Sequence, residues 1–245
     1  MSAATKMNLA VAGGIARLTL DDGRANAIGR GFLSELEACL AEAEASDAHS
    51  LILFGRPDFY SGGLDLKELP TLPPDELART AGHFVEMMKR LFLFPKPIIA
   101  AANGHAIAGG MMIYLAADLR LAVDRGDAKM GLNEAVTGIP ITGGTAALCM
   151  ATIPSQYQTE MMLHGRLVTP RVTLDREITH ELASDAKDLE RRAVARAEGL
   201  ADVNLEAYSL NKRMIREPVW EAAAEKGLAL GADAPSRNVF EGLRR

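Results

Sequence analysis

The sequence has few cysteines, no cluster of basic residues and no apolar run long enough to cross a membrane. Its 245 residues include two cysteines, Cys39 and Cys149, which lie far apart and lack the spacing of metal ligands. We therefore expect no metal site and a reduced, cytoplasmic setting. The formal net charge of -5 argues against nucleic-acid binding as the main task, because a nucleic-acid partner needs a basic surface.

Export and membrane insertion are disfavoured as well. Residues 1–6 carry no apolar signal core, and the longest apolar stretch, residues 106–117, is too short to cross a bilayer. The composition that remains is globular, with 48% hydrophobic residues. A chain of this length can bury a sizeable core as one large domain, or as a domain with an appendage.

The first half of the chain alternates stretches typical of strands with stretches typical of helices. Predicted strands cover residues 15–20, 50–54, 97–101 and 119–123, and apolar residues recur at helical spacing over 31–46, 74–94 and 110–117. This order predicts an α/β fold with mostly parallel strands joined by crossover helices. In such folds, ligands bind at the loops that follow the strands.

Beyond residue 144 the pattern is nearly all helical. Helices are predicted at residues 145–151, 156–164, 186–200, 205–216 and 219–230. Helices without a sheet partner of their own either pack on the sheet or contact another subunit, and the sequence leaves both open. We divide the chain into a core domain, residues 1–185, and a helical C-terminal region, residues 186–245.

Two glycine-rich turns each follow a predicted strand. Gly62 and Gly63 follow the strand at 50–54, and Gly109 and Gly110 follow the strand at 97–101. Such glycines can simply allow tight packing. They can also aim unpaired N–H groups at an anion, because the first N–H groups of a helix have no acceptor within it. One donor from each turn, aimed at one point, would stabilise an oxyanion, each contributing roughly 3 kcal/mol to a transition state.

A carboxylate, Glu134, stands among apolar neighbours. A carboxylate in that setting pairs with a cation, caps a helix, or has its pKa raised toward neutrality and serves as a base. The residues alone leave all three open. Two other conspicuous side chains are interpreted as structural: His105 as a packed or hydrogen-bonded histidine, and Asp118 as a charge at the end of a helix.

Taken together, these segments resemble the crotonase superfamily, which contains enoyl-CoA hydratases and isomerases. The resemblance rests on four motifs in the family's order: residues 62–69 (GGLDLKEL), 97–110 (PIIAAANGHAIAGG), 131–134 (GLNE) and 139–145 (IPITGGT). It implies a crotonase-like core of ββα units wound into a superhelix, with a helical C-terminal region. It also implies an acyl-CoA thioester as the substrate, without a further cofactor or a metal.

The resemblance assigns roles to individual residues. The backbone N–H groups of Leu64 and Gly109 would hold the thioester carbonyl, and Glu134 would be the catalytic carboxylate. The other residues that it places around the acyl thioester are Gly63, Leu66, Gly110 and Met112. Backbone atoms of Ala25 and Ala27 would contact the nucleotide of coenzyme A, and Lys67 and Arg24 could face its phosphates, although a solvated surface charge is the default for either.

One position departs from the hydratase pattern. Hydratases of this family carry a second catalytic glutamate just after the second glycine turn, where this chain has Met112, which can neither hold water nor transfer a proton. A single carboxylate suffices to move a proton between two carbons, and the GLNE motif resembles the enoyl-CoA delta isomerases. We therefore predict that Glu134 shifts the double bond of a 3-enoyl-CoA to the 2,3 position.

The resemblance also implies a homotrimer or a dimer of trimers, in which Asn211, Lys212 and Arg213 could approach a neighbouring subunit's site. Residues 171–184 depart from the family's usual ending, because the glycine expected before its last strand is missing, so the wall of the acyl end is not defined. Three alternatives stay open: hydration, acyl-CoA hydrolysis or carbon-carbon cleavage in the same fold, and a catalytically idle acyl-CoA-binding protein.

Overall fold

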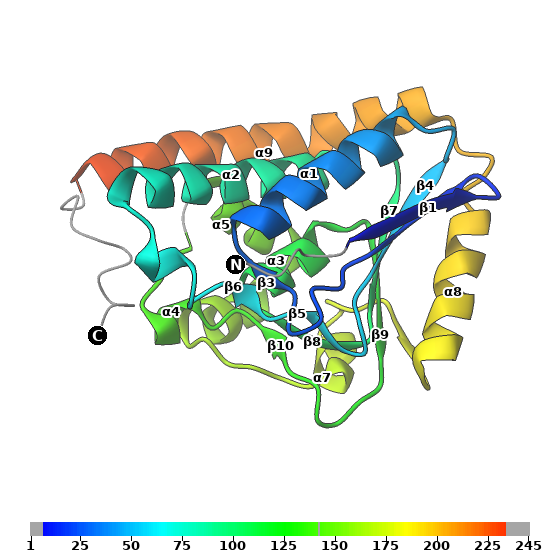
Figure 1. Ribbon diagram of the computed structural model, residues 1–245, viewed down its shortest axis with the longest axis horizontal. Helices are drawn as coiled ribbons and strands as arrows, with labels where there is room; N and C mark the ends of the chain where they lie inside the picture. Colours follow the sequence, from blue (N-terminus) through cyan, green and yellow to red (C-terminus); the bar gives the residue numbers. More distant parts are fainter. Residues whose placement is uncertain (1–6, 142, 234–245) are drawn as a thin grey trace.

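The computed structural model describes residues 7–141 and 143–233, which form an α/β structure around a six-stranded sheet (Figure 1). The strands of this sheet, in spatial order, are β1 (Asn8–Ala12), β2 (Ile15–Thr19), β4 (Ser50–Phe54), β7 (Ile98–Ala102), β9 (Leu119–Val123) and β11 (Glu181–Ala183). The hairpin β1–β2 is antiparallel, and the remaining neighbours are parallel. The predicted α/β fold with mostly parallel strands is confirmed.

Two small parallel sheets are built from the segments that follow these strands. One has the order β10-β8-β5, with β5 (Asp58–Ser61), β8 (Gly104–Ile107) and β10 (Met130–Gly131). The other pairs β3 (Ala27–Ile28) with β6 (Gly63–Leu64). Each of β4, β7 and β9 is therefore followed by a second short strand and then by a helix, and both glycine turns lie at the ends of these second strands.

Helices cover both faces of the large sheet. On one face lie α1 (Arg30–Ala45), α2 (Pro74–Phe92) and α3 (Gly109–Ala116), and on the other lies α8 (Ala186–Glu198) (Figure 1). Successive side chains of β4 point to opposite faces of the sheet. Leu51 packs in the core under α1–α3, and Ile52 packs in the core under α8. This explains why β4 reads as a continuous apolar run.

Of the other helices, α5 (Gly143–Thr152) packs against α2 and α3. The remaining described helices are the 3₁₀ helix η1 (Leu69–Thr71), α4 (Glu134–Thr137), α6 (Ser155–Gln158), the π-helix η2 (Thr159–Leu163), α7 (Pro170–Asp175) and α9 (Leu205–Asp233). The long helix α9 packs along α5 and forms one edge of the molecule (Figure 1). Across the part of the chain that the structure describes, none of these helices is long and apolar enough to span a membrane.

One prediction for the second half of the chain is wrong. A single helix, α9, replaces the two helices expected at 205–216 and 219–230, with Pro218 inside it. The segment 171–184, whose sequence departs from the family's usual ending, forms a helix and a strand, α7 and β11. Glu177, in place of the expected glycine, adopts a left-handed conformation with φ of 59°, so the backbone turns as a glycine would allow.

Residues 1–6 and 234–245 lie outside the described residues. The prediction that residues 1–6 carry no signal core, and the last part of the predicted C-terminal region, concern these residues.

Candidate functional site

The two glycine turns lie against each other, although the sequence separates them by more than forty residues. A Cβ added to Gly63, whose φ is 90°, would lie 2.8 Å from the carbonyl oxygen of Ile107 and 3.3 Å from the backbone nitrogen of Gly109. Gly110 lies so close to the Ser61 backbone that a Cβ at this position would clash with the Ser61 carbonyl. Glycine at these positions is what allows β6 and the start of α3 to approach this closely.

The local backbone leaves one N–H group on each turn aimed away from its own sheet or helix. In β6, the N–H of Asp65 donates to the Ile28 carbonyl at 3.0 Å, and successive residues of a strand point in opposite directions, so the Leu64 N–H points away from β3. Gly109 is the first residue of α3, where N–H groups have no intrahelical acceptor. Ala108 before it has φ of 52° and ψ of -125°, a sparsely populated conformation for a non-glycine residue.

These turns open into a cavity of about 720 Å³. Leu64, Gly109, Met112 and Glu134 all line this cavity. Its larger apolar members come mainly from η1, α2 and the segment between α4 and α5: Leu69, Leu77, Phe84, Val85, Ile139 and Ile141. Among the described residues that line it, the charged ones are Glu134 and Lys226, and Lys226 is exposed to solvent.

Glu134 is the first residue of α4 and its side chain is buried, with the residue 5% exposed. No described residue donates a hydrogen bond to its Oε2 atom. Burial raises the pKa of the Glu134 carboxyl to about 7, against a smaller lowering by its own backbone N–H. A carboxyl group with this pKa can both accept and return a proton near neutral pH.

Met112 lies on the first turn of α3 and is 3% exposed. Its thioether lines the cavity together with Glu134. A thioether has no proton to give and accepts hydrogen bonds weakly, so the described part of the cavity has one carboxylate and no second acid or base at this position.

The residues expected at the nucleotide and phosphates of coenzyme A lie beside the first glycine turn but outside the cavity wall. The Gly62 N–H donates to the Ala25 carbonyl at 2.8 Å, and Ala27 pairs with Gly63 between β3 and β6. Leu66 is 46% exposed and lines the cavity, and Lys67 is exposed next to it. Ala25, Ala27 and Lys67 thus flank one edge of the site.

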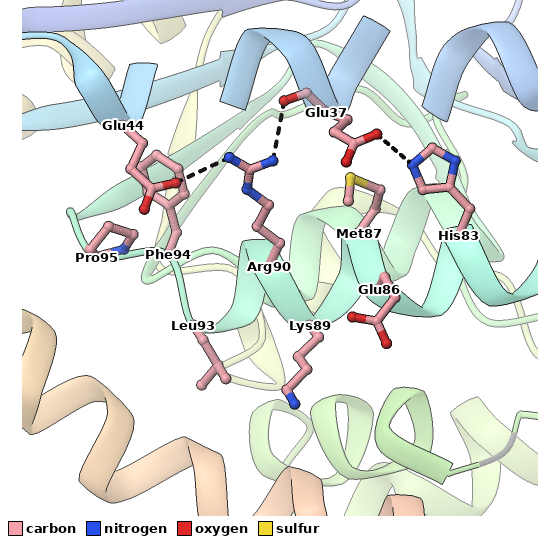
Figure 2. A pocket seen from close by; sticks show the side chains of 10 residues that line it. All are labelled: Glu37, Glu44, His83, Glu86, Met87, Lys89, Arg90, Leu93, Phe94 and Pro95. Atoms are coloured by element: carbon pink, nitrogen blue, oxygen red, sulfur yellow. Dashed lines mark hydrogen bonds and ion pairs between the residues drawn. The ribbon is translucent and has the colours of Figure 1, made fainter. Parts of the chain in front are cut away.

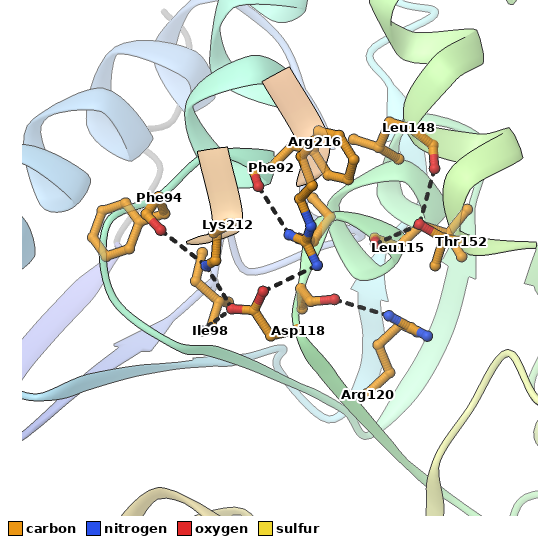
Figure 3. A network of polar contacts seen from close by, with 12 residues as sticks. Phe92, Phe94, Ile98, Leu115, Asp118, Arg120, Leu148, Thr152, Lys212 and Arg216 are labelled. Atoms are coloured by element: carbon orange, nitrogen blue, oxygen red, sulfur yellow. Dashed lines mark hydrogen bonds and ion pairs between the residues drawn. The ribbon is translucent and has the colours of Figure 1, made fainter. Parts of the chain in front are cut away.

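The expectation for Lys212 is wrong, because this side chain is buried. Its Nζ atom donates to Asp118 Oδ2 at 2.7 Å and to the carbonyl oxygens of Phe94 and Lys96 at 2.9 and 3.0 Å (Figure 3). Asp118 also pairs with Arg216 Nη2 at 3.0 Å, so it is the structural charge that was expected. Lys212 therefore anchors α9 to the core and does not reach toward another subunit.

His105 and a second concavity are separate from this site. His105 Nδ1 accepts the Lys129 N–H at 3.0 Å, as expected for a hydrogen-bonded histidine. A groove of about 760 Å³ lies between α1 and α2 (Figure 2). Its charges pair with one another, Glu37 with His83 and Glu44 with Arg90, each at 3.1 Å. Glu86 also lines the groove, but it is exposed, so among the described residues the groove has no buried carboxylate comparable to Glu134.

The sequence did not predict that α9 would line the cavity through Ala223, Lys226 and Gly227. Small residues four positions apart on one helix face were the available signal, but the sequence does not show which surface that face meets.

The chain is similar to known proteins over most of its length. The family described as enoyl-CoA hydratase/isomerase matches residues 10–234. A probable enoyl-CoA hydratase of Bacillus subtilis is 33% identical over 199 residues, which cover 80% of this chain and 76% of the relative. Carnitinyl-CoA dehydratase of Salmonella arizonae is 34% identical over 194 residues, covering 76% of this chain and 73% of the relative.

Solved structures share the fold. An enoyl-CoA hydratase/isomerase family protein from Pseudomonas syringae superposes with a TM-score of 0.84 at 25% identity, covering 93% of this chain and 97% of the other. Human mitochondrial delta3-delta2-enoyl-CoA isomerase superposes with a TM-score of 0.84 at 24% identity, covering 97% of this chain and 95% of the other.

Proposed function

Because this chain belongs to the enoyl-CoA hydratase/isomerase family and has the crotonase fold, we propose that it converts a 3-enoyl-CoA into a 2-enoyl-CoA. One observation carries this proposal. Glu134, which is buried and has an unpartnered Oε2, lines the same cavity as Met112, which can neither accept nor donate a proton.

In this mechanism, the thioester carbonyl oxygen accepts hydrogen bonds from the N–H groups of Leu64 and Gly109. These donors stabilise the negative charge that develops on the oxygen as the adjacent carbon loses a proton. The Glu134 carboxylate takes that proton from C2 and leaves a dienolate. Glu134 then returns a proton to C4, the double bond forms between C2 and C3, and the carbonyl is restored without net loss or gain of a proton.

The charge state of Glu134 fits both steps. With a pKa of about 7, a sizeable fraction of the carboxyl is ionised at neutral pH, and its conjugate acid is strong enough to return the proton. Adding water across the double bond needs a group to position and deprotonate the water while another protonates the carbon. Met112 cannot serve either role, which favours isomerisation over hydration.

The remaining assignments follow the family. Ala25 and Ala27 would contact the nucleotide of coenzyme A through backbone atoms, and Lys67 would face its phosphates, with no metal in the reaction. We further propose a homotrimer or dimer of trimers acting in fatty acid metabolism in the cytoplasm. The core domain, residues 1–185, would bind the acyl-CoA, and the C-terminal region, residues 186–245, would cover the site and contribute to the trimer.

The test compares two reactions of the purified protein. We expect 3-hexenoyl-CoA to be converted into 2-hexenoyl-CoA, followed by chromatography and mass spectrometry, and crotonyl-CoA to be hydrated far more slowly. Brisk hydration of crotonyl-CoA would contradict the interpretation of Met112. Binding of acyl-CoA esters without turnover, and without exchange of the C2 hydrogens in heavy water, would favour an idle binding protein instead.

A further inference from the structure

The last described helix, α9, forms part of the cavity wall. Ala223 and Gly227 of α9 line the cavity that Leu64 and Glu134 also line. In Figure 1, α9 runs along one edge of the molecule, well separated from β6 and α4, which carry the proposed reacting groups. Hence the cavity extends from these groups to α9.

The position of α9 is fixed by close packing. Gly144 of α5 leaves no room for a Cβ beside the ring of Trp220, which is 3% exposed, and a Cβ on Gly143 would lie 3.6 Å from the Cα of Ala224. One turn before Trp220, Arg216 donates to the Phe92 carbonyl at 2.8 Å and pairs with Asp118 (Figure 3). Because α5 meets α9 at two glycines and a largely buried ion pair also holds α9, this helix packs closely against the core.

The lining of the cavity suits a hydrocarbon chain: among the described residues its charged members are Glu134 and Lys226, and Lys226 is exposed to solvent. The hydroxyl of Thr80 donates to the Glu76 carbonyl at 2.7 Å, and that of Thr137 donates to the Glu134 carbonyl at 3.1 Å, so these two polar groups are satisfied within their own helices. Leu77 and Phe84 also line the cavity, and their side chains are apolar. Burial against such a surface favours methylene groups over any polar substituent.

The volume exceeds the need of a short acyl group. About 720 Å³ is roughly twenty-four times the volume of about 30 Å³ that one molecule occupies in liquid water, and a methylene group is about as large as a water molecule. A four-carbon acyl group would leave most of this space unfilled. Two of the three α9 residues at the wall, Ala223 and Gly227, are among the smallest available, so a larger side chain at either position would take up space in the cavity.

We propose that Ala223 and Gly227 set the upper limit of acyl-chain length, and that the substrates are linear, apolar acyl-CoA esters longer than four carbons. This proposal rests on the proposed function for its reaction, but it concerns binding. It can therefore be tested without turnover.

The experiment is calorimetric titration of the full chain with saturated butanoyl-, hexanoyl-, octanoyl-, decanoyl- and dodecanoyl-CoA. For the wild type we expect Kd to fall about fourfold per added methylene until the chain reaches α9, and then to level off. In Ala223→Leu the levelling should come about three carbons earlier, because leucine has about three more carbons than alanine, with the Kd of butanoyl-CoA unchanged.

The matched control is Ala222→Leu, the same substitution on the exposed side of α9, which should reproduce the wild-type series. Gly227→Ala provides a second variant that favours the helix, because alanine has the higher helix propensity, and it should shorten the series by about one carbon.

A wild-type Kd that does not change from butanoyl- to dodecanoyl-CoA would overturn the proposal. So would an Ala223→Leu series that matches the wild type while the variant is folded by circular dichroism. A normal chain-length series in a protein that isomerises no 3-enoyl-CoA would refute the proposed function and leave this proposal standing.

Discussion

Replacing Glu134 with glutamine should abolish most of the activity and, at the same time, make the protein more stable above neutral pH. The first effect follows from removing the base, which typically lowers a rate about 10³-fold. The second follows from the pKa of Glu134, which burial raises from 4.5 to about 7. Glutamine has nearly the same shape but no charge, so it avoids the desolvation of a carboxylate.

The magnitude follows from linkage. Because the folded pKa lies above the unfolded one, the folded state binds this proton more tightly than the unfolded chain does. The resulting stabilisation is full below about pH 4.5 and is lost as the pH rises through about 7. The difference of 2.5 pKa units corresponds to about 3 kcal/mol, so at pH 8 the variant should gain up to that amount over the wild type.

The assay is the free energy of unfolding in urea between pH 5 and pH 9 for the wild type, Glu134→Gln and Glu198→Gln. Glu198 lies on α8 and is exposed, so its substitution should shift stability by a small, constant amount. The gain of Glu134→Gln should grow with pH and level off near pH 8. A variant no more stable than the wild type at pH 8 would refute the argument from burial, and near wild-type isomerisation by it would refute the assignment of the base.

Four further predictions concern the same site and its supports. The kcat/KM of the wild type should rise with pH through about 7 and then level off, since the ionised form of Glu134 is the active one; a flat pH profile would argue against this carboxylate as base. Gly63→Ala should lower kcat about 10²-fold in steady-state assays, because φ of 90° and the contact with Ile107 both oppose a Cβ, whereas Gly126→Ala, with open space around it, should behave as wild type. Asp118→Asn should reduce the free energy of unfolding in urea by about 3 kcal/mol, because Lys212 then loses its buried partner; an unchanged midpoint would show that the ion pair contributes little. Lys67→Ala should weaken coenzyme A binding about threefold in low-salt titrations and have no effect at high salt, where screening removes the attraction; equal losses at both salt concentrations would exclude a role in phosphate binding.

The sequence predicted the features that depend on local chemistry. Strand-helix alternation predicted the parallel sheet, and the motifs around Gly63 and Gly109 predicted the two turns that the structure brings together. The burial of Glu134 could be suspected from its apolar neighbours, whereas the absence of a partner for Oε2 depends on the packed structure.

Features that depend on distant contacts could not be predicted. Proline usually interrupts a helix, so Pro218 predicted a break in α9. Lys212 pairs with Asp118 before the proline, and Trp220 packs on Gly144 after it, so both parts of α9 are held against the core as one helix. Neither contact is visible in the sequence. The three-residue strand β11 is too short for a pattern and forms through its pairing with β9.

The docking of α9 also has a consequence for the order in which the protein is made. The contact between Lys212 and Asp118 joins residues 94 positions apart, and the ribosome releases α9 after the sheet, both glycine turns and Glu134 have left the exit tunnel. A nascent chain therefore holds its proposed base before it can enclose an acyl group. A chain that stopped before Leu205 would lack Ala223 and Gly227, so its cavity would be open on the side that α9 lines.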